Sequence, residues 1–403
     1  MNPYYNILRQ LPADYKNILN IIQKKGPISK SEIQEITGLK LTKLNSLMQF
    51  FIDSLIIEKK CVGDSTGGRP PVLFDIIDKK MYVLGIGMGS LNYNITIMDF
   101  KANLIASRKF EMNMTYKPQE FIELAYIQAA ELLDENNIDY NKLLGLGIGT
   151  TGSLNRSEGK IIYSASSRMN ESWININILE LFEEKFQIPC TIDVNISSVA
   201  IAEYLYGKFK GTDRLMYLNC AMSIRSGFVS NGRLLRSTND KDDAFGHMMV
   251  NIDGEACSCG NYGCVECYSS IPAIVKKFRS ALKLGRFTVI QKSIDEINYT
   301  DICDAAKAGD ILAQEILRDA AVTLGCGLAN YINLLNPSVV IFNGLLINES
   351  DFFYRISVET SVQKLKNLNM DYNIEFSKSD SLSGFFLIGP CVVFLEALLG
   401  NLN

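Results

Sequence analysis

Residues 246–266 read GHMMVNIDGEACSCGNYGCVE. His247, the only histidine of the chain, is followed within 17 residues by Cys257, Cys259 and Cys264. Three thiolates and one imidazole suit tetrahedral zinc, and the intervening glycines allow a short loop to turn all three sulfurs towards one ion. These side chains fill all the coordination positions, so we expect a structural zinc rather than a catalytic one. The alternative is a loop of buried free cysteines.

The sequence on both sides of this stretch alternates between strand and helix patterns. Apolar strands are expected at 81–87, 94–99, 143–149, 188–194, 215–219 and 338–342. Helices are expected at 118–135, 197–206 and 311–335. This alternation predicts an α/β body, and its length suggests two lobes with a ligand cleft between them.

The first part of the chain has the pattern of three short helices. Apolar residues at helical spacing predict the first over 14–25, and Ser29 with Glu32 has the spacing of a capping box for the second. The third, over 41–54, follows a glycine turn, as in a helix-turn-helix whose last helix enters the major groove of DNA. Its expected DNA contacts are Lys40, Thr42, Lys43, Asn45, Ser46 and Gln49. The alternative is a plain three-helix bundle with a solvated face.

A β wing is expected after the third helix. Strands at 55–61 and 72–76 flank a loop that contains Gly67-Gly68-Arg69-Pro70-Pro71. An arginine carried on glycines and stiffened by prolines can enter the narrow minor groove of A·T-rich DNA. Arg69 is therefore a further expected DNA contact.

The wing, the helices before it and the glycine-containing strand after it resemble the head of ROK (repressor, open reading frame, kinase) family regulators. The resemblance covers nearly the whole chain, and its most specific piece is the stretch 246–266. It implies a winged helix-turn-helix followed by a two-lobed actin-like, ribonuclease H-like ATPase fold. The expected domains are the DNA-binding head at 1–78, a first lobe at 79–192 to which 385–403 returns, and a second lobe at 193–384 with the zinc loop.

The resemblance also allows the requirements of a ROK sugar kinase to be checked. The family's first phosphate loop, Asp-x-Gly-Gly-Thr, corresponds to residues 87–91, which lack the carboxylate and the final hydroxyl. Its glycine-rich second loop corresponds to 221–227, where a single glycine remains. Asn195 stands where the family has its catalytic aspartate, and an amide cannot accept the proton of a sugar hydroxyl. We therefore expect no catalytic residue and no kinase activity.

Sugar recognition is altered as well. The family's Glu-x-Gly-His becomes Ala244-Phe245-Gly246-His247, and the asparagine of its Ser-Pro-Asn stretch becomes Ser166. The resemblance implies an effector site at Ser166, Asn195, Ala244, His247 and Glu266. Only His247 and Glu266 of the usual hydroxyl-binding set remain, so a typical hexose would bind weakly unless other residues compensate.

Composition is consistent with a basic head on an acidic body. The chain of 403 residues is 47% apolar with a net charge of −4. Residues 1–80 hold 12 Lys/Arg against 8 Asp/Glu, which is near +4 and leaves about −8 for the rest, although ordinary solvated surfaces show such asymmetry too. The sequence shows no secretory signal and no apolar stretch that could span a bilayer, and six of the ten cysteines are scattered singly, so we expect a cytoplasmic protein that binds no membrane.

These observations predict a transcriptional regulator, a repressor of carbohydrate-related genes. It would bind a double-stranded DNA operator as a homodimer or homotetramer and take a sugar or sugar-derived effector in the cleft. One alternative is a glucokinase-like sugar kinase with an extra N-terminal domain. The other is a regulator controlled by a protein partner.

Overall fold

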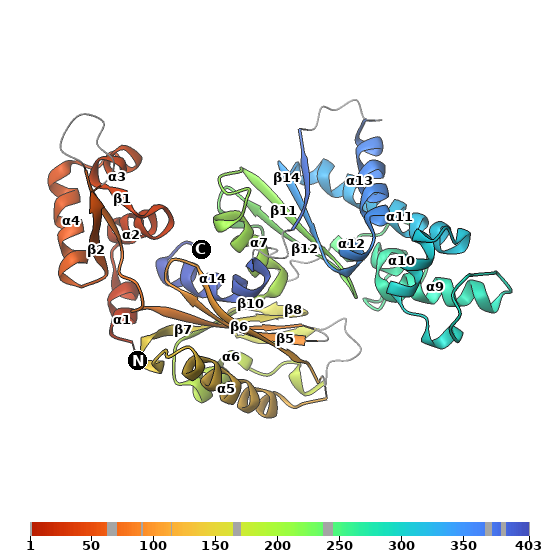
Figure 1. The fold of residues 1–403 in the computed structure, drawn as a ribbon, viewed down its shortest axis with the longest axis horizontal. Coiled ribbons are helices and arrows are strands. Elements are labelled where there is room, and N and C mark those ends of the chain that lie inside the picture. The colour runs from red at the N-terminus through yellow and green to blue at the C-terminus, as the bar shows by residue number, and fades with distance from the viewer. Residues whose placement is uncertain are drawn as a thin grey trace. The chain divides into compact units, whose positions relative to one another are not determined.

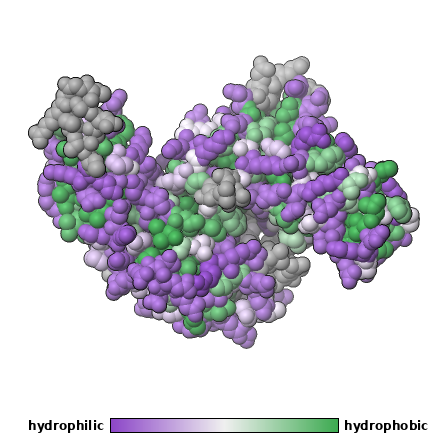
Figure 2. Space-filling model, in the orientation of Figure 1, coloured by the Kyte–Doolittle hydropathy of each residue, from purple (hydrophilic) through white to green (hydrophobic). Residues whose placement is uncertain are grey.

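The computed structural model describes residues 2–62, 71–89, 92–113, 115–163, 171–236, 245–366, 373–379 and 384–402. The chain forms two compact units, of which the first comprises Met1–Lys208 with Gly384–Asn403 and the second Phe209–Ser383. Among the described residues, no helix combines the length and the apolar character needed to cross a membrane. Hydrophilic residues dominate the face drawn in Figure 2.

Four helices and a small sheet form the N-terminal head of the first unit (Figure 1). They are α1 (Pro3–Gln10), α2 (Ala13–Lys25), α3 (Lys30–Thr37) and α4 (Leu41–Asp53), with β1 (Ile28–Ser29), β2 (Ile57–Val62) and β3 (Val72–Ile76) in the order β1-β3-β2. The predicted capping box is confirmed, because the Ser29 hydroxyl accepts from the Glu32 N–H at 3.3 Å and the Glu32 carboxylate accepts from the Ser29 N–H at 2.8 Å. Gly38 then ends α3 in the left-handed conformation, with φ +66°.

A five-stranded sheet forms the rest of the first unit. Its strands are β4 (Tyr82–Met88), β5 (Asn92–Asp99), β6 (Leu104–Glu111), β7 (Leu143–Thr150) and β10 (Cys190–Val194), in the order β10-β7-β4-β5-β6. Strands β10, β7 and β4 are parallel, whereas β5 and β6 pair antiparallel. Helices α5 (Pro118–Glu135) and α6 (Ile178–Phe186) cover one face, and α7 (Asn195–Tyr206) and α14 (Phe385–Leu399) cover the other (Figure 1). A short hairpin of β8 (Ser153–Asn155) and β9 (Lys160–Tyr163) follows β7.

Helix α14 lies directly on the sheet because glycines line the surface beneath it. A Cβ atom at Gly147 in β7 would lie 1.8 Å from the Pro390 carbonyl oxygen, and one at Gly389 would lie 3.0 Å from the Ser198 carbonyl carbon. A side chain at either glycine would therefore push α14 away from β7 or from α7. The two helices consequently form one packed pair over the sheet.

The second unit is built on another five-stranded sheet. Its strands are β11 (Arg214–Cys220), β12 (Ile224–Ser230), β13 (Arg233–Leu234), β14 (Val339–Asn343) and β15 (Glu375–Lys378), in the order β13-β12-β11-β14-β15. Its α-helices are α8 (Glu266–Ser269), α9 (Ile271–Lys283), α10 (Tyr299–Lys307), α11 (Ile311–Leu335), α12 (Leu345–Glu349) and α13 (Asp351–Lys366). Apolar residues of the sheet and of these helices form a common core.

The long predicted elements are confirmed, since α5 and α11 have the expected bounds. Several starts differ by two residues: α7 begins at Asn195 rather than 197, β2 at Ile57 rather than 55, β5 at Asn92 rather than 94, and β10 at Cys190 rather than 188. Strand β12 begins at Ile224, inside the segment that corresponds to a phosphate loop. The expected lobe limit after residue 192 would assign α7 to the second lobe. In the structure α7 belongs to the first unit because it packs on α14. The 384–402 segment also lies in that unit, as expected for 385–403.

Candidate metal centre and DNA-binding face

The metal-ligand candidates come together in the second unit. The ligand atoms of His247, Cys257, Cys259 and Cys264 all lie within 4.8 Å of one another. The Sγ atoms of Cys259 and Cys264 are 3.7 Å apart, and the Cys257 Sγ is 3.6 Å from the His247 Nδ1. A tetrahedral site with Zn–S bonds of about 2.3 Å would place its sulfurs about 3.8 Å apart. The group is therefore arranged as a metal site requires.

Backbone hydrogen bonds fold the loop so that its thiols meet. The Cys257 N–H donates to the Asn261 carbonyl at 2.7 Å, and the Gly263 N–H donates to the Glu255 carbonyl at 2.7 Å. Gly263 has φ +66°, and a Cβ there would lie 1.5 Å from the Asn251 carbonyl oxygen, so only glycine fits. This turn directs the following Cys264 into the core, where its side chain is buried.

The local environment sets the protonation of the candidate ligands. Burial lowers the pKa of His247, although the Glu266 carboxylate opposes this shift, so the imidazole is neutral at neutral pH. Burial disfavours the Cys257 thiolate, but hydrogen bonds from Cys259 and neighbouring thiols outweigh it and lower the pKa of Cys257. A neutral imidazole and a thiolate are the forms that bind a metal ion. Burial and the neighbouring thiols raise the pKa of Cys264, so this ligand would lose its proton on binding the ion.

Glu266, just after this loop, connects it to strand β12. Its Oε2 accepts from the Ile224 N–H at 3.0 Å, at the start of β12. A Cβ at Gly246 would lie 2.3 Å from the Ile224 carbonyl oxygen, so the backbone before His247 packs closely on β12. His247 and Glu266 are thus neighbours in the second unit.

Asn195, the third described effector candidate, lies in the first unit at the start of α7. Its Nδ2 donates to the Met88 carbonyl at the end of β4, over 2.6 Å. A Cβ at Gly149 of β7 would lie 2.0 Å from the Asn195 Oδ1. The amide is therefore packed between two strand ends and joins α7 to β4 by a hydrogen bond that an ionised carboxylate could not donate.

The segment that corresponds to the second phosphate loop is a tight hairpin. Cys220 pairs with Ile224, and the Ala221 N–H donates to the Ser223 carbonyl at 3.2 Å between them. The Arg225 Nε donates to the Ser223 Oγ at 3.2 Å. Side chains and paired backbone thus occupy this turn, where a kinase presents free glycine N–H groups to phosphate.

Three expected site residues lie outside the described part of the chain. They are Arg69 of the wing and the effector candidates Ser166 and Ala244. Residues 90–91 of the first phosphate-loop counterpart are also outside it.

The remaining DNA-contact candidates form one exposed row on and next to α4. Lys40, Thr42, Lys43, Asn45, Ser46 and Gln49 are all exposed, whereas Leu44, Leu47, Met48 and Phe51 on the opposite side are buried. Three of the polar side chains have partners within the head. Lys43 forms an ion pair with Asp14 of α2, and the Asn45 Oδ1 accepts from the Lys30 Nζ at 2.7 Å. The Gln49 Nε2 donates to the Asp53 Oδ1 at 2.7 Å.

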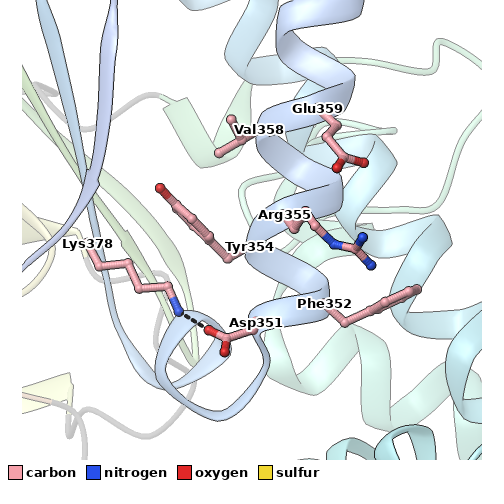
Figure 3. A pocket seen from close by; sticks show the side chains of 7 residues that line it. All are labelled: Asp351, Phe352, Tyr354, Arg355, Val358, Glu359 and Lys378. Carbon is pink, nitrogen blue, oxygen red and sulfur yellow. Dashed lines mark hydrogen bonds and ion pairs between the residues drawn. The ribbon is translucent and has the colours of Figure 1, made fainter.

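Sequence analysis missed a depression along α13, with a volume of about 500 Å³ (Figure 3). Its lining residues are Asp351, Phe352, Tyr354, Arg355, Val358, Glu359 and Lys378. Lys378 of β15 forms an ion pair with Asp351, and its Nζ lies 4.9 Å from the centre of the Tyr354 ring. The helical spacing of 351, 354, 355, 358 and 359 marks one face of α13, but that spacing does not indicate a depression.

Residues 83–389 match the model of the ROK family, so the chain belongs to this family. The chain is 26% identical over 388 residues to the DNA-binding transcriptional dual regulator NagC of Escherichia coli K12, covering 96% of this chain and 93% of the relative. It is 27% identical over 337 residues to the xylose repressor of Bacillus subtilis, covering 83% of each chain.

Solved structures show the same fold. A ROK family transcriptional regulator described as a homologue of the E. coli MLC protein matches with a TM-score of 0.80 at 20% identity, covering 98% of each chain. A ROK glucokinase from Streptomyces griseus matches with a TM-score of 0.65 at 20% identity, covering 98% of the kinase but 77% of this chain. The fold is thus an α/β, actin-like ROK body with an N-terminal helix-turn-helix head.

Proposed function

We propose that this chain is a DNA-binding transcriptional regulator, a repressor of carbohydrate-related genes that acts in the cytoplasm. The observation that carries the proposal is the head placed before the ROK body, with the exposed polar row of α4. The proposal is supported by the similarity to two proteins described as regulators, NagC and the xylose repressor, whose matches cover 96% and 83% of this chain. We propose the head at 1–78 and, with the boundary moved so that α7 stays in the first unit, a first lobe at 79–208 with 384–403 and a second lobe at 209–383.

The same chain lacks what phosphoryl transfer needs, so we propose that it is not a kinase. Asn195 has no usable basicity and is hydrogen-bonded to the Met88 carbonyl. The 221–227 segment is a hairpin with Arg225 and Ser223 side chains at its turn. Without a base the sugar hydroxyl is not activated, and without a phosphate loop the nucleotide is not held in place.

We further propose that His247, Cys257, Cys259 and Cys264 bind a structural zinc ion. The ligand set and the spacing of the ligand atoms support zinc, and no protein position is left for a reactive water. The ion would hold the loop before α8 and with it the positions of His247 and Glu266. A sugar or sugar-derived effector would meet these two residues in the second unit, and Asn195 of the first unit stays a separate effector candidate.

DNA selection from a pool of random duplexes tests the function directly. We expect the purified chain to enrich a defined sequence and bind it at physiological salt with a Kd on the order of 10⁻⁸ M or tighter. Arg69→Ala should weaken binding about tenfold, mainly for sites with A·T-rich flanks, because the minor groove there concentrates negative potential. Asn45→Ala should relax sequence preference within the major groove.

The matched control is Lys277→Ala, which removes an exposed cation of the second unit and should leave affinity unchanged. Failure to enrich any sequence, together with sugar-dependent ATP consumption, would replace the regulator with the kinase alternative.

A further inference from the structure

One face of α2 carries polar residues that contact α7, the Phe100 carbonyl, the end of α14 and Asn401 just after it. The residues are Lys16, Asn20, Gln23 and Lys24, and their spacing places them on the side opposite the head's recognition helix contacts. The Lys16 Nζ donates to the Leu398 carbonyl at 3.1 Å, which satisfies one of the last carbonyls of α14. Asn20 and Asn401 exchange two hydrogen bonds of 3.0 Å between their amides. The head is thus fixed to the end of α14 by directional contacts.

A buried chain of hydrogen bonds continues from this face into α7. The Gln23 Nε2 donates to the Tyr206 hydroxyl oxygen at 3.1 Å and to the Phe100 carbonyl at 3.0 Å. The Tyr206 hydroxyl in turn lies 3.2 Å from the Glu396 Oε1, to which it donates. Burial and the Glu396 charge raise the pKa of Tyr206, so the phenol keeps its proton. Gln23 and Glu396 are each only 1% exposed, and Tyr206 between them is half-buried.

The carboxylate of Glu396 is the meeting point of these contacts. The Lys24 Nζ donates to its Oε2 at 2.9 Å, and the Asn401 Nδ2 donates to the same oxygen at 2.6 Å. A buried carboxylate is costly unless it is paired and hydrogen-bonded. Glu396 therefore favours the position of α2 that brings Lys24 and Tyr206 to it.

Both helices of this network also lie at the strand ends next to Asn195: α7 begins at that residue, and α14 reaches them at Pro390, five residues after its start at Phe385. Helix α7 begins at Asn195 and ends at Tyr206, so it spans about 16 Å at 1.5 Å per residue. In α14, the Pro390 ring lies at the same strand ends as Asn195: a Cβ at Gly149 would lie 2.0 Å from the Asn195 Oδ1 and 3.0 Å from the Pro390 Cγ. Six residues further along α14 is Glu396. A displacement at the Asn195 end therefore has two packed helices through which to reach α2.

We propose that Tyr206 and Glu396 are positioning residues for the DNA-binding head, and that α7 and α14 carry a change at Asn195 to α2 through them. This inference rests on the proposed function as a regulator. It assigns a role in regulation to two residues outside both the DNA-binding row and the effector candidates.

A second contact between head and lobe provides the matched control. The Lys101 Nζ donates to both carboxylate oxygens of Asp75 at 2.8 and 2.9 Å and to the Gly26 carbonyl at 2.9 Å. Lys101 follows β5, so this contact bypasses α7 and α14. Lys101→Met should alter the attachment of the head without altering its coupling to residue 195.

The experiment is a double-mutant cycle read as affinity for the duplex that the wild type selects. Asn195→Asp is nearly isosteric but cannot donate to Met88, and Tyr206→Phe removes only the hydroxyl. Independent sites this far apart combine within about a factor of two. We expect Asn195→Asp to change affinity by at least about threefold in the wild-type and Lys101→Met backgrounds and by less than that in the Tyr206→Phe background. Hydrogen exchange of α2 should change with Asn195→Asp in the same two backgrounds only.

Equal affinity of Asn195→Asp and wild type, or equal effects in all three backgrounds, would overturn the inference while leaving DNA binding intact. If the wild type selects no duplex, the proposed function fails instead, and α2 exchange still tests the coupling. If Asn195→Asp does not fold, Asn195→Ser removes the donor without adding charge and takes its place in the cycle.

Discussion

Asn195 is the residue that we propose stands in place of the catalytic aspartate of ROK kinases. Its hydrogen bond to the Met88 carbonyl gives the side chain a structural role between α7 and β4. An aspartate at this position would face the carbonyl with no proton to share, so the site and the strand end are adapted to an amide. We therefore expect that a change at this one residue does not restore the chemistry of the family's kinases.

Asn195→Asp should leave ATP turnover at background in the presence of glucose. A lone carboxylate contributes its usual ~10²–10⁴-fold only when nucleotide and sugar are already held in line. The hairpin at 221–227 does not offer the nucleotide such a site. A coupled assay of ADP release checks this, with the unmodified chain as the control. Glucose-dependent turnover by the variant would mean that the phosphate loops still function.

The metal site gives a second prediction at the scale of single residues. Purified protein should contain about one zinc per chain, and Cys259→Ser should lose most of it and unfold at a lower temperature, because metal binding and loop folding are coupled. Elemental analysis and thermal unfolding measure the two effects.

Cys326→Ser is the matched control, since Cys326 is a half-buried free cysteine of α11 outside the ligand group. It should retain the zinc. A wild-type zinc content well below one ion per chain would contradict the assignment of the zinc ligands. Equal loss of zinc in Cys259→Ser and Cys326→Ser would contradict it too.

Helix α4 carries its polar row in contact with acidic neighbours. Lys43 forms an ion pair with Asp14, although both side chains are more than half exposed. Phosphate must compete with this carboxylate for Lys43. Asp14→Asn should therefore raise DNA affinity severalfold and steepen its salt dependence, whereas Lys43→Ala should lower affinity and make the dependence shallower.

The control for this pair is Asp319→Asn, which breaks a similarly exposed ion pair with Lys277 in the second unit. Its affinity and salt slope should equal those of the wild type. The same slope for Asp14→Asn and Asp319→Asn would exclude Lys43 from the DNA interface.

Elements with strong local signals could be predicted from the sequence. Ser29 and Glu32 predict the start of α3, and the apolar spacing of α4 predicts which side faces the core, because caps and periodicity are local properties. The spacing of His247 and the three cysteines in the sequence likewise predicts that their ligand atoms lie close together. Arg69, Ser166 and Ala244 stay predictions.

The contacts of α2 with α14 could not be predicted in this way. Asn20, Gln23 and Lys24 read as a solvated helix face, and nothing local distinguishes them from one. Their partners lie far away in sequence, at separations of 77 for Gln23 with Phe100, 183 for Gln23 with Tyr206 and 372 for Lys24 with Glu396. The start of β12 at Ile224 was missed because the family resemblance suggested a phosphate loop there.

For the whole molecule, we expect a homodimer or homotetramer that places two heads on one operator. Exposed apolar side chains after α9, Leu284 at 87% and Phe287 at 83% exposure, give the second unit surface that a second copy can cover. Two-fold symmetry of the protein should appear as a palindromic operator with half-sites about 10–10.5 base pairs apart or a multiple of that. Sedimentation measures the oligomeric state, and footprinting measures the symmetry and spacing of the operator. A monomer bound to a single half-site would contradict both the expected oligomer and the expected palindrome.

The contact of Lys24 with Glu396 joins residues that are 372 positions apart. On the ribosome, at about 5–20 residues per second, the head emerges roughly 20–75 s before the helix that holds it. During that interval the polar face of α2 lacks the partners that Tyr206, Glu396 and Asn401 supply. The order of synthesis thus delays the attachment of α2 until both lobes have been made.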